Sequence, residues 1–234
     1  MPPLPATGTV VAPYTPASVD RDVTTTILSV AVLGFMATRL VGGVRVSRSA
    51  GGRLLVRQVV SRLRWRHVWP VPIVLAVVLV AAGLLVQVPG LHWGWWGAIG
   101  GDGNPAFGMT DSTSGTVWEW LVPLAFVALL IPALPLFAHA EERWFRAGAE
   151  QWSWRRRTWK TLQFGLVHAL VGIPVGAAFA ISLAGAWFLR VYLRAVRTTG
   201  SQRDATLESA TAHTAYNGVI ICVVLVALVL TGLP

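Results

Sequence analysis

The sequence is poor in charge and in cysteine. Only 12% of its 234 residues are charged, whereas 54% are hydrophobic and the mean hydropathy is +0.60. The one cysteine, Cys222, can form no disulfide within the chain. It lies in the last apolar run with no cation nearby in sequence to favour a thiolate, which argues against a cysteine nucleophile. We expect a small, buried and inert side chain there.

The sequence also lacks the motifs of several protease classes. Neither the H-E-x-x-H of zinc proteases nor a G-x-S-G serine motif occurs, and nothing repeats at a fixed period. The run Gly101-Asp102-Gly103 does not match the G-x-G-D of aspartyl intramembrane proteases. These absences disfavour serine, cysteine and aspartyl chemistry.

Apolar runs of about 20 residues recur along the chain, which is the length that a helix needs to cross a bilayer. They predict an all-α, polytopic transmembrane helix bundle with about six membrane-embedded helical segments. We expect residues 1–22, rich in Pro and Thr, to form a flexible tail rather than a signal peptide, and residues 23–234 to form a single transmembrane domain. The predicted segments are Val23–Val44, Val68–Val88, Val117–Ala138, two short helices within Thr161–Leu189, and Ala205–Leu233.

The net charge of +9 comes from basic residues whose distribution along the chain indicates membrane topology rather than a surface for nucleic acid. All basic residues except Arg21 fall into Arg39–Arg66, Arg143–Lys160 and Arg190–Arg203. The positive-inside rule places such clusters on the cytoplasmic side. It also favours a helix break near Gly172-Ile173-Pro174, which returns the last cluster to that side. We therefore predict a multi-pass protein of the cell membrane, in contact with the bilayer and not with nucleic acid, most consistent with a bacterial plasma membrane.

Two loops complete this topology. The segment Pro89–Thr116 has no Lys or Arg and carries tryptophans where an interfacial belt would lie, so it is expected outside. The segment Arg45–His67 alternates arginines with apolar residues. It fits either an amphipathic helix in the headgroup layer or a plain basic loop, and the sequence leaves both open.

Ionisable and polar groups recur near one depth on three predicted helices. Glu142 and Arg146 are four residues apart and can pair on one helix face, while Glu141 projects about 100° away. A carboxylate or imidazole at membrane depth is costly unless it faces protein or a water-filled cavity. We therefore predict one shared cavity on the cytoplasmic side. Its other members are Phe164 and His168, then His213 and Asn217, each pair one turn apart.

Each group also has a structural interpretation. The Glu142–Arg146 pair could lie on a helix surface. His168 could be a core histidine bonded to a backbone carbonyl, and His213 with Asn217 could join helices by hydrogen bonds. The placement of all of them at one depth favours a common site.

The three motifs E-E-x-x-x-R (Glu141–Arg146), F-x-x-x-H (Phe164–His168) and H-x-x-x-N (His213–Asn217), in this order, resemble the CPBP family. That family comprises the CAAX prenyl proteases and the bacterial Abi proteins, which are glutamic intramembrane endopeptidases. The resemblance covers about residues 117–234. The chain departs from the family's pattern at Trp144 and in the basic, Trp-rich loop that follows the glutamates.

The resemblance implies hydrolysis of a peptide or membrane-protein substrate without cofactor or metal. It implies that Glu141 and His168 hold and activate a water, and that His213 and Asn217 stabilise the oxyanion. Glu142 and Arg146 would orient the base, and Phe164 would line the site.

Other functions remain open at this point. A zinc protease could use Glu141, His168 and His213 as ligands, although Asn217 would then have no role. An inactive membrane scaffold or immunity-type protein of the same fold would carry the same motifs. A transporter could use them as a proton relay, but paired interrupted segments are missing.

Overall fold

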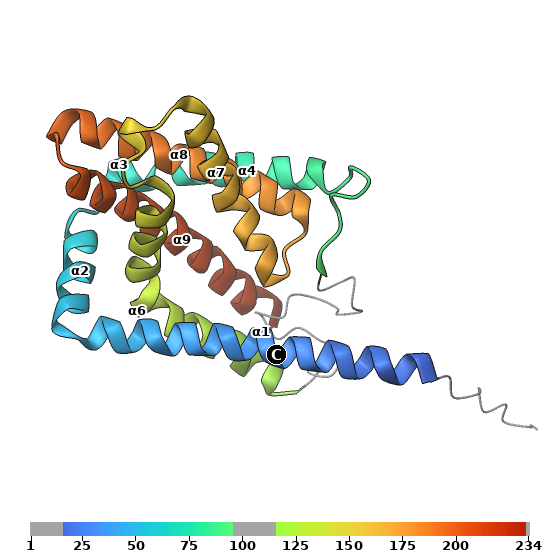
Figure 1. The fold of residues 1–234 in the computed structure, drawn as a ribbon. Coiled ribbons are helices and arrows are strands. Elements are labelled where there is room, and N and C mark those ends of the chain that lie inside the picture. The colour runs from blue at the N-terminus through green and yellow to red at the C-terminus, as the bar shows by residue number, and fades with distance from the viewer. Residues whose placement is uncertain (1–15, 96–115, 233–234) are drawn as a thin grey trace, which may run out of the picture.

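The computed structural model describes residues 16–95 and 116–232, and within these ranges the chain forms helices and their connections without a strand. The predicted all-α fold is therefore confirmed. The elements are α1 (Pro16–Arg48), α2 (Ala50–Ser61), α3 (Trp65–Val68), α4 (Val71–Leu85), α6 (Trp118–Arg146), η2 (Ala149–Gln151), α7 (Trp154–Leu166), η3 (Val167–Val171), α8 (Val175–Thr199) and α9 (Gln202–Gly232) (Figure 1).

Four stretches of the described chain are long and apolar enough to cross a bilayer. They are Trp65–Leu85, Leu124–Gln151, Val175–Thr199 and Gln202–Val226. This composition fits a multi-pass membrane protein. The predicted first span falls within α1, and the larger count of about six segments stays a prediction. The proposed outer loop lies mostly outside the described residues, as does the N-terminal tail for most of its length.

Helix α8 packs against α4, α7 and α9 and is lined by small residues. The closest approach is to α7, where a Cβ added to Gly165 would lie 2.2 Å from Ser182 Oγ and 2.4 Å from the carbonyl oxygen of Ala178. Only a glycine fits at that crossing, because the atoms it would meet include fixed backbone. This contact packs α7 against α8, the helices on either side of the predicted break near Gly172.

The predicted break near Gly172 is present. Gly172 has φ 90°, a conformation that favours glycine, and Pro174 precedes the first residue of α8. The predicted bounds were less accurate, because α7 begins within the basic loop and α8 continues through the arginines to Thr199. No glycine or proline occurs between Leu189 and Gly200, where φ is 67°. Arginines are good helix formers, so they extend α8 rather than end it.

The basic segment Arg45–His67 contains the helix α2, as the amphipathic-helix interpretation of this segment requires. Ser49 caps α2 by accepting a hydrogen bond from the Gly52 amide at 3.0 Å. The fully buried Val59 packs on Leu207 and Ala210 of α9. In Figure 1, α2 (light blue) leads from the end of α1 toward α3, which precedes α4. Its location in a headgroup layer stays a prediction.

One side chain departs from expectation. Cys222 is exposed on α9 rather than buried. It lies within the apolar stretch Gln202–Val226, whose outer face is suited to lipid, so an apolar thiol can be exposed there without cost.

Candidate active site

The end of α6 presents two adjacent glutamates to the bundle. The helix continues past the predicted end at Ala138 to Arg146, because the sequence between them has no breaker, and stops before Gly148, whose φ is 87°. Within this last part, Arg146 Nη1 lies 2.7 Å from Glu142 Oε1. Glu142 is fully buried and Arg146 is 1% exposed. The predicted i,i+4 pair is therefore confirmed, as a buried pair and not a surface one.

Glu142 also binds α9 through both carboxylate oxygens. Its Oε1 lies 2.9 Å from His213 Nδ1, and its Oε2 lies 2.5 Å from Ser209 Oγ. A carboxylate beside a guanidinium accepts hydrogen bonds, so His213 carries a hydrogen on Nδ1. The opposite ring nitrogen, Nε2, is then directed away from Glu142. One carboxylate thus sets both the position and the orientation of the imidazole.

Aromatic rings enclose the Arg146 guanidinium. Its Cζ lies 4.3 Å from the centre of the Phe164 ring and 5.3 Å from that of Phe188, and Nη2 donates to the Gly185 carbonyl at 3.3 Å. Arginine over an aromatic face gains a favourable cation–π interaction, particularly when shielded from water. The His213 ring stacks on Phe188 with 4.4 Å between centres. Phe164 therefore packs on Arg146 and His213, with Phe188 beside it, and its role in lining a catalytic site stays a prediction.

Glu141 has a different environment from its neighbour. Its side chain is 38% exposed, yet Oε2 is buried and accepts no hydrogen bond from the described residues. That oxygen lies 3.8 Å from His213 Nε2. The separation is too long for a direct hydrogen bond. A carboxylate and an imidazole thus face each other, and a water between them stays a prediction.

His168 lies next to these residues, but no contact joins it to Glu141 within the described part of the chain. It lies in η3, and its Nδ1 donates to the Phe164 carbonyl at 2.8 Å, which leaves Nε2 free to accept. The Phe164 ring centre is 5.3 Å from that of His168 and 5.6 Å from that of His213. The two imidazoles therefore both pack on Phe164. A core histidine would make the same backbone bond, so binding of water by His168 stays a prediction.

Asn217 lies one turn after His213 on α9 and is half-buried. Its carboxamide has no hydrogen-bond partner within the part of the chain that the structure describes, and it remains available to a ligand. Convergence of all four predicted catalytic residues on one cavity stays a prediction. Within residues 16–95 and 116–232, no group of three or more His, Cys, Asp or Glu side chains is placed to hold a metal ion.

Ser209 was not identified from the sequence. It is fully buried, and its Oγ lies between Glu142 Oε2 and the Phe188 carbonyl, which is 2.9 Å away. The available signal was the spacing: Ser209 precedes His213 by four residues and therefore shares its helix face.

Comparison with known proteins found no relative of this chain. No family model matches the chain, and neither a curated protein nor a solved structure matches it. The family resemblance therefore rests on the three motifs.

Proposed function

We propose that the chain is an intramembrane endopeptidase in which Glu141 activates a water against a peptide carbonyl. The observation that carries this proposal is the buried Glu141 Oε2, which faces His213 Nε2 across 3.8 Å. A general base must lie within hydrogen-bond reach of the proton it removes. A water between these two atoms satisfies that requirement.

The proposed reaction proceeds in two steps. The water oxygen attacks the carbonyl carbon while its proton passes to Glu141, and the carbonyl oxygen becomes an oxyanion. The protonated Glu141 then gives its proton to the amide nitrogen as the C–N bond breaks, releasing an amine and a carboxylic acid. No cofactor takes part, in keeping with the family that the motifs resemble.

The position of His213 supports a role in stabilising the oxyanion. Its Nδ1 is held by Glu142 at 2.9 Å, and its Nε2 faces Glu141 across 3.8 Å, beside the proposed reacting centre. A hydrogen on Nε2 would point toward the developing oxyanion. Asn217, one turn away, is the second proposed donor.

The geometry also supports a protein-only site rather than the zinc alternative. The zinc alternative takes Glu141, His168 and His213 as ligands. Within residues 16–95 and 116–232, no three such side chains are placed to hold one metal ion.

The test is peptide release from a peptide library by the purified full chain, read by mass spectrometry. Glu141→Gln keeps the shape and removes the base, so turnover should stop while the fold survives. Glu150→Gln is the matched control, because it makes the same change in η2, where the side chain contacts Tyr192 and Gln202 and none of the site residues, and it should keep activity.

Three results would contradict the proposal. Full activity in Glu141→Gln would remove this residue from the chemistry. Loss of activity on exhaustive chelation, with recovery on adding zinc, would favour a metal mechanism. If the wild-type chain releases no peptide from any library, the inactive scaffold is the better description.

A further inference from the structure

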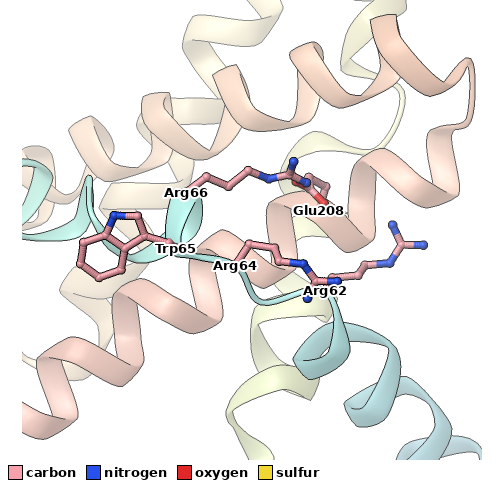
Figure 2. Close-up of a pocket in the computed structure, with 5 residues that line it drawn as sticks. All are labelled: Arg62, Arg64, Trp65, Arg66 and Glu208. Carbon is pink, nitrogen blue, oxygen red and sulfur yellow. The ribbon is translucent and has the colours of Figure 1, made fainter.

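A basic pocket lies apart from the candidate active site, where the connection from α2 to α4 meets the first turns of α9. It is open to its surroundings and has a volume of about 520 Å³, a size typical of small-ligand sites. Its lining residues are Arg62, Arg64, Trp65, Arg66 and Glu208. In Figure 2, Arg66 reaches toward Glu208, Arg64 extends below this pair, and the Trp65 indole points the other way.

Two of the three arginines already have acidic partners on α9. Arg62 Nη2 lies 2.6 Å from Asp204 Oδ1, and Arg66 Nη2 lies 2.7 Å from Glu208 Oε1. Both arginines keep exposed surface, with side chains 36% and 67% accessible. A phosphate oxygen can therefore reach their remaining N–H groups without breaking either pair.

The buried His67 fixes the acidic side of the pocket. Its Nδ1 accepts from the Arg64 amide at 3.1 Å, so its Nε2 carries the hydrogen and donates to Glu208 Oε1 at 2.8 Å. His67 is only 3% exposed. The carboxylate that faces the arginines is therefore held in place by a neutral ring.

Arg64 supplies the excess positive charge. Its Nη1 donates to the carbonyl oxygens of Ser61 and Leu63 at 2.9 and 3.0 Å, and no acidic side chain in the described ranges pairs with it. Three guanidinium groups thus face two carboxylates, Asp204 and Glu208. The pocket keeps one positive charge that an anion can neutralise.

The surroundings indicate where that anion comes from. Trp65 is 74% exposed and is the first residue of the candidate span Trp65–Leu85, and Trp69, one turn later, is 51% exposed. Exposed tryptophans at the end of a span mark the level of lipid headgroups. Basic pockets between helices at this level bind phosphate-bearing headgroups.

We propose that this pocket binds the phosphodiester of an anionic phospholipid, with Arg64 and Arg66 on the phosphate and Trp65 beside the glycerol and upper chains. Free phosphate offers the same oxygens but nothing for the indole to contact. The proposal does not depend on the hydrolysis assigned to Glu141.

The test measures lipid binding to the purified full chain in neutral detergent by native mass spectrometry. The probes are phosphatidylglycerol, phosphatidylcholine with the same acyl chains, and inorganic phosphate as a competitor. Arg64→Gln and Arg66→Gln should each weaken phosphatidylglycerol binding about fivefold. Arg57→Gln is the matched control, because it removes the same charge from an exposed position of α2 that does not line the pocket. It should bind as the wild type does.

Three outcomes would overturn the proposal. Equal weakening by Arg57→Gln would show diffuse attraction to a basic surface. Equal binding of phosphatidylcholine, which carries the same phosphodiester beside a choline cation, would show that the pocket does not recognise the net negative charge of the headgroup. Displacement of the lipid by inorganic phosphate at the same concentration would assign the site to a soluble anion. Thermal unfolding of each variant shows whether the fold is retained, and Arg66→Gln decides the matter if Arg64→Gln unfolds.

Discussion

The substitution Glu142→Gln should destabilise the fold strongly, because this carboxylate joins α6 to α9 inside the bundle. The side chain is fully buried and accepts from Arg146, Ser209 and His213. A glutamine fills nearly the same volume but carries no charge. It leaves the Arg146 guanidinium, 1% exposed, without its paired carboxylate and with only the unbonded charge of Glu141 nearby.

The expected magnitude follows from that uncompensated charge. Removing one partner of a buried ion pair costs about 3–5 kcal/mol of the free energy of unfolding. The aromatic rings around Arg146 and the Gly185 carbonyl offset only part of this cost, since they carry no full negative charge. Arg66→Gln breaks a pair that is exposed on the arginine side, and it should cost less than about 1 kcal/mol.

The assay is equilibrium unfolding of the purified chain in mixed micelles, compared for wild type, Glu142→Gln and Arg66→Gln. A second substitution isolates the cause: adding Arg146→Met to Glu142→Gln removes the orphaned charge and should restore part of the lost stability. The reasoning fails if Glu142→Gln costs no more than Arg66→Gln. It fails as well if the double variant is less stable than Glu142→Gln alone.

Three further predictions test other parts of the molecule. Gly165→Ala should cost about 1–3 kcal/mol in the same unfolding assay, because its Cβ would overlap α8, whereas Gly218→Ala meets nothing within 4 Å and should not destabilise. Asn217→Ala should lower kcat about 10²–10³-fold with little change in KM in the peptide-release assay, as loss of one oxyanion donor does; a change confined to KM would contradict that role. In a Cys222→Ser background, single cysteines within Arg155–Arg157 should resist an impermeant thiol reagent applied to intact cells; labelling from outside would reverse the topology.

Local features of this fold could be predicted from the sequence. The Glu142–Arg146 pair follows from i,i+4 spacing, and the break at Gly172 follows from a glycine and a proline within three residues. Helix ends were less predictable, because α6 and α8 both continue beyond the uncharged apolar runs that end at Ala138 and Leu189. A membrane span ends where apolar residues end, but a helix ends where its backbone hydrogen bonding ends, and arginines and glutamates continue that pattern.

Contacts between distant helices could not be read from the sequence. The expected partner of Glu141 was His168, whereas the structure sets His213 opposite Glu141 and turns His168 toward the Phe164 carbonyl. This outcome depends on how α9 is rotated against α6, and the residues involved are about 70 positions apart in the chain. Periodicity shows which residues share a face of one helix but not which helix that face meets.

Two groups of contacts fix the rotation of α9 about its axis. Asp204 and Glu208, one turn apart, pair with Arg62 and Arg66 on the connection after α2. Ser209 follows Glu208 directly, and together with His213 it binds Glu142 on α6. Turning α9 by one residue, about 100°, would break the ion pairs and the buried carboxylate network together. The surface pairs alone are weak, but the buried network is not, so Glu142 holds the orientation that keeps His213 Nε2 opposite Glu141.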